Sequence, residues 1–313
     1  MIGFDIGGTK CAVSVGYECN GELIIEDKRV IPTDLSVSPY EMIDRMCTLA
    51  EELTDTFDAI GISCGGPLDE QRGIILSPPN LPDWDEVHIT DMLTERFGVP
   101  ARICNDANAC ALAEWRFGAG RGTKNMVFLT FGTGLGAGLI LDGRLYSGTN
   151  GNAGEVGHVR LEKDGPVGYG KAGSFEGFCS GGGIARLGKQ AAARALAEGR
   201  AMSFCKNADE IEGIDTKLLA EAANSGDEVA LEVFRESGRR LGMGLSMIID
   251  ILNPEVIVIG SVFARSGHLL RAEMEKVIDT EALAPSAAVC RIAPAELGDE
   301  IGAFAAIAVA MGE

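Results

Sequence analysis

Residues 2–10 read Ile-Gly-Phe-Asp-Ile-Gly-Gly-Thr-Lys, from Ile2 to Lys10. The apolar run predicts a short β-strand with Asp5 near its end, and two glycines, a hydroxyl and a cation follow directly. Glycine lets backbone N–H groups approach an anion closely, because no Cβ stands in the way. Thr9 and Lys10 can donate to phosphate oxygens, and the Asp5 carboxylate suits a magnesium ion or its bound water. The stretch therefore predicts a strand that leads into a phosphate-binding turn.

This turn is not a P-loop. A P-loop requires the order Gly-Lys-Ser/Thr, whereas the order here is Gly8-Thr9-Lys10. Taken alone, the nine residues are also compatible with a tight β-turn that binds nothing, and that alternative stays open on the stretch itself.

A second stretch echoes the first. Residues 127–138 read Val-Phe-Leu-Thr-Phe-Gly-Thr-Gly-Leu-Gly-Ala-Gly, again an apolar strand that leads into glycines around a threonine. Strand-like residues follow each copy, and we expect a turn at Gly16 after the first and at Asp142-Gly143 after the second. The glycines of the second copy lack the spacing of a dinucleotide-binding fingerprint. The two copies predict a duplicated fold with one phosphate-binding hairpin from each half.

Length and charge limit the function classes. The chain has 313 residues, of which 46% are hydrophobic and 23% charged, and this suits a globular protein of two domains. Its formal net charge of −19, with no local basic patch, argues against a nucleic-acid partner. A phosphate ligand remains compatible with this charge if a metal ion and backbone dipoles screen it.

Targeting signals and cysteines point to one compartment. The chain begins with a core strand at Ile2, so we expect no signal peptide, and no apolar run reaches the roughly 18 residues of a membrane span. The nine cysteines form no C-x-x-C pair, which favours reduced thiols in a cytoplasm. Most of them, such as Cys64 and Cys104, are expected to be small core residues.

The other elements follow from hydrophobic periodicity and capping residues. We expect helices at 39–57, 107–117, 227–252 and 299–311, and strands at 59–63, 99–104, 255–260 and 290–293. Ser38 is the expected N-cap of the first helix and Asp299 that of the last. Gly238, Gly242 and Gly244 in the long helix would let a neighbouring element approach closely.

Two groups of polar residues stand out beyond the glycine turns. Asp106 lies at a strand-to-helix junction, where α/β folds place ligands, although aspartate is also a favoured helix N-cap and that alternative stays open. Glu155 and His158 are spaced to face one another on a turn, and Glu176 follows in the same glycine-dense region. On composition alone, each acid is equally compatible with a solvated surface.

Together these motifs resemble those of the ROK family of sugar kinases, repressors and uncharacterised open reading frames. They occur in the family's order over nearly the whole chain: Asp5-Ile6-Gly7-Gly8-Thr9-Lys10, Asn105-Asp106-Ala107-Asn108, Gly132-Thr133-Gly134-Leu135-Gly136 and Gly154-Glu155-Val156-Gly157-His158. The resemblance implies an α/β fold, the two-lobed actin-like ATPase (ribonuclease H-like) duplication with an active-site cleft between the lobes. We expect an N-terminal lobe of residues 1–117 with the C-terminal helix 299–313, and a C-terminal lobe of residues 118–298.

The resemblance also implies roles for residues at the matching positions. Asp106 would be the catalytic base. The sugar ligands would be Gly66, Asn80, Asn105, Asp106, Glu155, His158 and Glu176. The ATP-binding residues would be Asp5, Gly7, Gly8, Thr9, Lys10, Thr133, Gly134 and Gly260. Asp5 would also bind magnesium, directly or through water.

One departure from the family concerns zinc. Many relatives carry a zinc site built from the motif's histidine and a C-x-C-G-x-x-G-C-x-E run, but Val167, Tyr169 and Ser174 stand here where thiolates would be. Valine cannot ligate zinc, and the other two are poor ligands beside cysteine. We expect no structural zinc, a segment held by packing with Tyr169 and Phe175 as candidates, and His158 free to bind the sugar.

The implied activity is phosphorylation of a hexose or N-acetylhexosamine hydroxyl by ATP with magnesium, as in a glucokinase. The implied protein is a cytoplasmic homodimer. Two alternatives stay open. The first is a non-catalytic, sugar-sensing ROK protein without a DNA-binding domain. The second is an ATPase of the same superfold that acts on a protein or acyl group, against which Glu155 and His158 argue.

Overall fold

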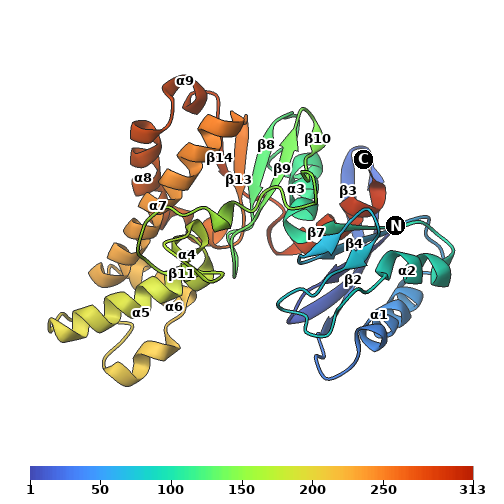
Figure 1. Ribbon diagram of the computed structural model, residues 1–313, viewed down its shortest axis with the longest axis horizontal. Coiled ribbons are helices and arrows are strands. Elements are labelled where there is room, and N and C mark those ends of the chain that lie inside the picture. The colour runs from blue at the N-terminus through green and yellow to red at the C-terminus, as the bar shows by residue number, and fades with distance from the viewer. Residues whose placement is uncertain (313) are drawn as a thin grey trace. The chain divides into compact units, whose positions relative to one another are not determined.

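The computed structural model describes residues 1–312. Two five-stranded sheets have the strand orders β3-β2-β1-β4-β7 and β10-β9-β8-β13-β14 (Figure 1). When the five strands of each sheet are numbered along the chain, both orders read 3-2-1-4-5. The duplication expected from the two glycine–threonine stretches is therefore confirmed.

The bounds of the elements are as follows. The strands of the first sheet are β1 (Ile2–Ile6), β2 (Lys10–Cys19), β3 (Glu22–Pro32), β4 (Ile60–Cys64) and β7 (Ala101–Asn105). Those of the second are β8 (Met126–Leu129), β9 (Ala137–Leu141), β10 (Arg144–Leu145), β13 (Val256–Ile259) and β14 (Arg291–Pro294). Two small hairpins are β5 (Leu68–Asp69) with β6 (Ile74–Ile75), and β11 (Val167–Gly168) with β12 (Lys171–Ala172).

The helices are α1 (Pro39–Leu53), α2 (Ile89–Phe97), α3 (Asp106–Phe117), α4 (Phe175–Phe178), α5 (Gly181–Ala197), α6 (Thr216–Asn224), α7 (Glu228–Leu252), α8 (Val262–Glu281), α9 (Ala284–Ala287) and α10 (Ile301–Met311). Short 3-10 turns are η1 (Val156–His158), η2 (Ala208–Gly213) and η3 (Gly298–Glu300). None of these helices, which all lie within residues 1–312, is both long and apolar enough to span a membrane.

The chain divides into two compact units. Unit 1 comprises Met1–Phe128, Gly138–Ala153 and the chain from Glu296 onward, and unit 2 comprises Leu129–Ala137 and Gly154–Ala295. Unit 1 thus reaches past the lobe limit expected at residue 117 and also takes in β9 and β10. The two units are described separately below.

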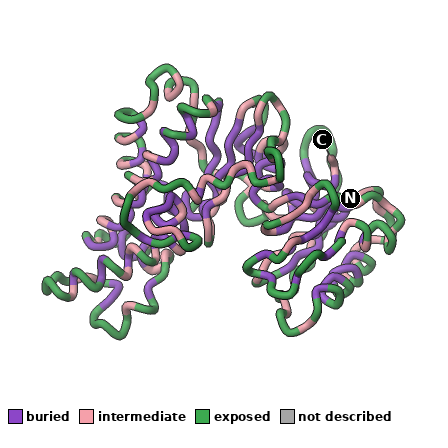
Figure 2. Tube along the Cα trace, viewed as in Figure 1, coloured by how far each residue is buried: buried purple, intermediate pink, exposed green. Residues whose placement is uncertain are grey.

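In unit 1 the first sheet is covered on both faces. One face packs against α1 and α2, and Phe4, Ile62 and Met46 are fully buried in the core between this face and the helices. The central strands of the sheet, β1 and β4, are largely buried (Figure 2). The other face receives α10, because Gly3 and Gly61 leave room for its backbone: a Cβ added at Gly3 would lie 2.8 Å from the Ala306 Cβ. The C-terminal helix is therefore part of the core of this unit.

In unit 2 the helix α7 packs along α8. A Cβ added at Gly238 would lie 2.5 Å from the Leu270 carbonyl oxygen, and one at Gly242 would lie 2.6 Å from that of Met274. The close approach predicted from the small residues of this helix is confirmed. Because an alanine at either position would overlap backbone rather than a flexible side chain, the two helices could not stay at this separation.

Two local expectations are wrong. The chain does not turn at Gly16: β2 continues to Cys19, Gly16 sits at a register shift between β2 and β3, and the turn falls at Asn20-Gly21. Asp299 does not cap the last helix, because it lies inside η3 and α10 begins two residues later. The Ser38 cap is confirmed, since its Oγ accepts the Glu41 N–H at 3.2 Å.

The cysteines are all free. Most are buried, including Cys64 and Cys104, which are 0% and 4% exposed. Burial raises the pKa of both thiols above the ordinary value, so these side chains stay protonated at neutral pH and pack as small apolar groups. The expectation that such cysteines belong to the core is confirmed.

Candidate functional site

Three parallel strands of unit 1 end level with one another. In the register of β1, β4 and β7, Ile6 lies beside Cys64, and Cys64 lies beside Asn105. The glycine turn after β1, the Gly65-Gly66 pair after β4 and the Asn105-Asp106 pair after β7 therefore meet at one edge of the sheet. The carboxyl edge of such strands is where open α/β sheets bind ligands.

The turn after β1 is fixed by hydrogen bonds and by close packing. The Gly7 N–H donates to the Lys10 carbonyl at 3.2 Å, and the Thr33 hydroxyl donates to the Gly7 carbonyl at 2.6 Å. A Cβ at Gly8 would lie 2.5 Å from the backbone oxygen of Asn80 and 2.7 Å from its Cβ. The structure thus places Asn80, from the proline-rich loop of residues 77–84, directly against the predicted phosphate turn. Thr9 and Lys10 are exposed beside it.

Asp5 lies half-buried at the end of β1. Burial raises its pKa, and the negative charge of Asp106 raises it further, while Lys28 and Lys10 act in the opposite direction. A Cβ added at Gly302, in the first turn of α10, would overlap the Asp5 carboxylate. The Asp5 carboxylate therefore lies against the start of α10, and the negative charge of Asp106 acts on it. A bound cation would offset the cost of holding two negative charges near one another.

Asn105 and Asp106 divide the roles at the start of α3. Asn105 is the N-cap, and its Oδ1 accepts the Ala107 N–H at 3.0 Å, so the interpretation of Asp106 as the N-cap is wrong. Asp106 occupies the first helical position and its Oδ1 lies 2.7 Å from the same N–H. The Asn105 Nδ2 lies 3.3 Å from the point where a Cβ on Gly66 would be, so the amide group faces the Gly65-Gly66 turn.

The Asp106 side chain is exposed to solvent, but the surrounding protein removes enough water from the carboxylate to shift its pKa. Desolvation raises the pKa of Asp106, and the hydrogen bond from the Ala107 N–H partly offsets this effect. A carboxylate with a raised pKa is a stronger base than a free aspartate, and an accessible one can reach a substrate hydroxyl. The environment of Asp106 suits a general base.

Glu70 belongs to this edge and was not predicted. One carboxylate oxygen accepts the Asn105 N–H at 2.8 Å, and the other lies 3.4 Å from the Ser147 hydroxyl. Glu70 therefore fixes the backbone immediately before Asp106. No motif marks it in the sequence, because its partners are 35 and 77 residues away along the chain.

In unit 2 the second glycine turn closes on itself. The Gly132 N–H donates to the Gly134 carbonyl at 3.0 Å, and the Gly136 N–H donates to the Thr130 hydroxyl at 2.9 Å. Thr133 is exposed at the tip. Gly260, at the end of β13, donates its N–H to the Leu129 carbonyl at 2.9 Å, so the structure places it beside the strand that leads into this turn.

Glu155, His158 and Glu176 lie in one hydrogen-bonded segment of unit 2. Glu155 precedes η1 and His158 ends it, and the His158 N–H donates to the Glu155 carbonyl at 3.2 Å. Glu176, in α4, accepts the Leu135 N–H at 3.1 Å and so reaches the second glycine turn. A Cβ on Gly157 would lie 3.3 Å from that of Glu176, which places the three polar residues close together.

The segment that would hold zinc in relatives does not fit this metal. Val167 is 48% exposed and has no ligand atom, and the Ser174 hydroxyl is buried and accepts the Gly177 N–H at 3.1 Å. The Tyr169 ring packs edge-on against the His158 ring at 4.9 Å, while its side chain is 67% exposed. Phe175 is 1% exposed, so the expectation that it helps to pack the segment is confirmed. Within residues 1–312, no three His, Cys, Asp or Glu side chains are grouped to hold a metal ion.

The sequence of this chain is similar to known proteins over most of its length. The model of the ROK family matches residues 1–313. The chain belongs to the ROK family. This ROK protein is 35% identical to a glucokinase of Thermotoga maritima, over 89% of this chain and 87% of the relative. It is 31% identical to an N-acetylmannosamine kinase of Shigella flexneri, over 88% and 87% of the two chains.

A solved structure shows the same fold. The ROK glucokinase from Streptomyces griseus, crystallised with glucose and AMPPNP, is 32% identical and superposes with a TM-score of 0.80. The match covers 100% of this chain and 99% of the other. The ROK protein described here therefore has the two-lobed actin-like ATPase fold of this family's sugar kinases, as the sequence resemblance implied.

Proposed function

We propose that this ROK protein transfers the terminal phosphoryl group of ATP to a hydroxyl of a hexose or N-acetylhexosamine, as a glucokinase or N-acetylmannosamine kinase does. The observation that carries the proposal is the level ending of β1, β4 and β7. It collects the glycine turn, Gly66, Asn80, Asn105 and Asp106 at one edge of unit 1. The activities of the related kinases support the same reaction class.

In this proposal Asp106 is the general base. Its carboxylate accepts the proton of the attacking sugar hydroxyl, which typically contributes about 10²- to 10⁴-fold to the rate. Phosphoryl transfer otherwise depends on positioning and on neutralising charge at the transferring group. Lys10, the Thr9 hydroxyl and the N–H groups of the Gly7-Gly8 turn supply donors on the unit 1 side, and Thr133, Gly134 and Gly260 are the proposed nucleotide-binding residues of unit 2.

Magnesium is the proposed metal, and Asp5 is the residue that would hold it. The structure fits this role, because Asp5 is a half-buried carboxylate whose pKa is raised by burial and by Asp106, and a cation would relieve both effects. Magnesium is usually held by one or two carboxylates, substrate phosphates and water, so a dedicated cluster of ligands is not required. When bound, it would neutralise charge on the phosphate oxygens.

Sugar recognition falls to hydrogen-bonding side chains. Asn80 and the Asn105 amide lie at the unit 1 edge, while Glu155, His158 and Glu176 are the proposed sugar ligands of unit 2. The Asn105 Oδ1 is engaged in capping α3, so its Nδ2 is the group left to donate to a sugar oxygen. Polar sites of this kind discriminate strongly, because a missing hydroxyl leaves a buried polar group unpaired.

The test is ADP release from purified protein with ATP and magnesium against glucose, N-acetylglucosamine, N-acetylmannosamine, fructose and allose. The proposal predicts sugar-dependent ADP release with at least one of them, and loss of most of it in Asp106→Asn. A wild type that phosphorylates no sugar, or a variant that matches it, would refute the assignment. Sugar binding by calorimetry without turnover would favour a sugar-sensing protein instead.

The compartment, the oligomeric state and the partners are also proposals. We infer a cytoplasmic homodimer that binds sugar and ATP and no nucleic acid, in keeping with free cysteines and a net charge of −19. We also keep the two-lobe division predicted from the sequence, 1–117 with 299–313 and 118–298, as a proposal. Light scattering at micromolar protein, with and without sugar, tests the dimer.

A further inference from the structure

The segment from Gly154 to Ser180 carries three proposed sugar ligands but has little regular structure of its own. Its internal hydrogen bonds join distant parts: the Phe175 N–H donates to the Val159 carbonyl at 2.8 Å, and the Glu162 N–H donates to the Gly173 carbonyl at 3.1 Å. These bonds link the residue after His158 to α4, which contains Glu176. A movement of either part would therefore move both ligands.

One face of α7 holds this segment. Ser237, Arg240 and Gly244 are spaced i, i+3 and i+7, so they lie along one side of the helix. The Ser237 hydroxyl donates to the Phe178 carbonyl at 2.9 Å, and both groups are buried. A Cβ on Gly244 would overlap the ring of Phe175. Both ends of the short helix α4 thus rest on α7.

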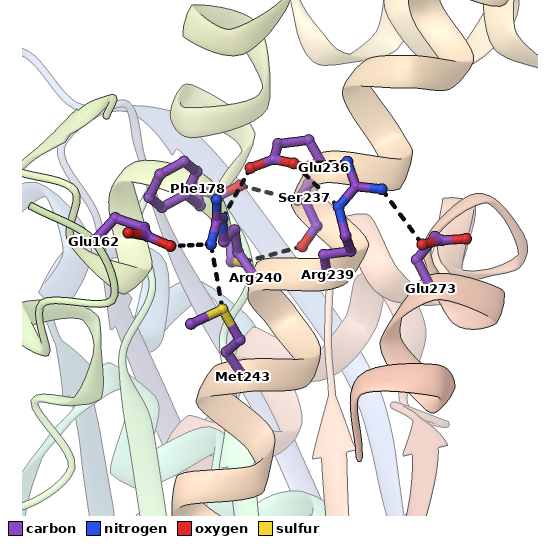
Figure 3. A network of polar contacts seen from close by, with 9 residues as sticks. Glu162, Phe178, Glu236, Ser237, Arg239, Arg240, Met243 and Glu273 are labelled. Carbon is purple, nitrogen blue, oxygen red and sulfur yellow. Dashed lines mark hydrogen bonds and ion pairs between the residues drawn. The ribbon is translucent and has the colours of Figure 1, made fainter. Parts of the chain in front are cut away.

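Arg240 contacts both the loop of the segment and helix α4 (Figure 3). Its guanidinium pairs with Glu162, a residue of the segment's loop, and with Glu236 one turn earlier on α7 at 2.8 Å. The same group lies 5.1 Å from the centre of the Phe178 ring. The side chain is only 22% exposed, so solvent screens these interactions less than at an open surface.

We propose that Arg240 is a positioning residue, which holds the loop at Glu162 and helix α4 at Phe178 so that His158 and Glu176 keep the arrangement needed to bind a sugar. This inference rests on the proposed function only in naming a sugar as the ligand of His158 and Glu176. The contacts themselves join a loop and a helix in a segment where Val167 offers no ligand atom and the Ser174 hydroxyl is engaged by the Gly177 N–H.

The planar shape of the guanidinium is part of this role. Its Nη1 and Nε meet carboxylates from two different elements while its face lies over an aromatic ring, and the compact ammonium of lysine cannot do both. Arg240→Lys should therefore restore only part of the function that Arg240→Ala loses. Glu162→Gln removes the charge on the loop side and leaves α7 unchanged.

Arg239 provides a matched control on the same helix. It pairs at 2.7 Å with Oε2 of Glu236, the carboxylate whose Oε1 Arg240 contacts, and at 3.4 Å with Glu273 of α8, and neither carboxylate belongs to residues 154–180 (Figure 3). Arg239→Ala removes the same charge and the same number of atoms as Arg240→Ala. A difference between the two variants reports the contacts to Glu162 and Phe178.

The first measurement is hydrogen exchange of peptides within residues 154–180, and it needs no substrate. We expect exchange about tenfold faster in Arg240→Ala than in wild type or Arg239→Ala, with a smaller increase in Glu162→Gln and Arg240→Lys. Circular dichroism of each variant checks that the rest of the chain is folded. Unchanged exchange across this segment in both Arg240→Ala and Glu162→Gln would overturn the proposal.

The second measurement separates positioning from general stability. On the sugar chosen by the ADP assay, Arg240→Ala should raise the sugar KM about tenfold, with the ATP KM and kcat nearly unchanged. Faster exchange with an unaltered sugar KM would overturn the link to sugar binding. If the wild type phosphorylates no sugar, the proposed function fails by itself, and the exchange result alone decides whether Arg240 holds the segment.

Discussion

The two glycine–threonine turns come from the same kind of strand but differ in charge. In the first, Asp5 precedes the glycines and Lys10 follows them. In the second, the position of Asp5 is taken by Thr130, and the residues that follow the turn are apolar. The first turn is closed by the hydrogen bond from the Gly7 N–H to the Lys10 carbonyl and by contacts from Thr33 and Asn80.

The second turn is closed by its own backbone, by the Thr130 hydroxyl, by Glu176 of α4 and by the Gly181 N–H, which donates to the Gly132 carbonyl at 2.7 Å. Gly132 bonds to Gly134, Gly136 bonds to Thr130, and the Leu135 N–H donates to Glu176. The turn itself carries no charged side chain, and the carboxylate that it meets, Glu176, comes from α4. Both turns share the strand–glycine–threonine pattern, while the carboxylates proposed for metal binding and proton transfer, Asp5 and Asp106, lie in unit 1.

The largest expected contrast between the turns is steric. Gly8→Ala places a Cβ 2.5 Å from the Asn80 backbone oxygen, whereas a Cβ at Gly132 finds its nearest neighbour, the Thr130 oxygen, at 3.3 Å. We expect Gly8→Ala to lower kcat/KM by about 100-fold and Gly132→Ala by less than about tenfold. Steady-state kinetics of both variants provides the measurement, and equal losses would contradict the contrast.

The second contrast concerns the metal. Asp5→Asn should raise the magnesium concentration for half-maximal rate about tenfold, because a carboxylate that holds a metal or orients its water is lost. Thr130→Ala, at the matching position of the second turn, should leave the magnesium dependence unchanged. Titration of magnesium at fixed ATP distinguishes them. A similar shift in both variants would remove the distinction between a charged and a neutral turn.

The third contrast is in stability against pH. The pKa values of Asp5 and Asp106 are raised, by burial first and for Asp5 also by Asp106, so folding favours their protonated forms. Wild-type stability should therefore fall as pH rises through these pKa values, and Asp5→Asn should melt a few degrees higher at about pH 8 and equally at about pH 4. Melting curves without nucleotide or magnesium test this. A variant that melts lower at both pH values would contradict it.

The smallest expected effect lies in the second turn. Thr130→Val removes the hydroxyl that accepts the Gly136 N–H at 2.9 Å while keeping the shape of the side chain. We expect about 1–2 kcal/mol of lost stability, the usual cost of leaving a partly buried donor unpaired, and a kcat within about threefold of wild type. Urea denaturation with parallel kinetics measures both. A loss of kcat without a loss of stability would give Thr130 a chemical role.

The sequence predicted the features that depend on neighbours along the chain. The glycine turns, the Ser38 cap, the packing role of Gly238 and Gly242, and the placing of Asp106 at a strand end all follow from local patterns. Gly16 shows the limit of such patterns, because a glycine between strand-like residues suits a bulge as well as a turn. Asn20-Gly21, a stronger turn signal, lies only four residues on.

Features that depend on contacts across the fold were not predictable. Glu70 meets Asn105, and Arg240 meets Glu162, over separations of 35 and 78 residues, and single charged residues carry no periodic signal. The Asn105 cap was missed for a different reason. Asparagine and aspartate both favour that position, and only the backbone shows which of the two adjacent residues takes it.

The role of Asp106 as general base is decided by the kcat of Asp106→Asn on the preferred sugar, together with the sugar dissociation constant of the same variant by calorimetry. Asparagine keeps the size and the hydrogen bond to the Ala107 N–H but cannot take a proton. The account predicts a fall in kcat of about 10²- to 10⁴-fold with sugar affinity changed by less than about tenfold. A difference of up to about threefold in kcat is within experimental scatter. A kcat of the variant within about threefold of wild type would therefore contradict the assignment of Asp106 as the base.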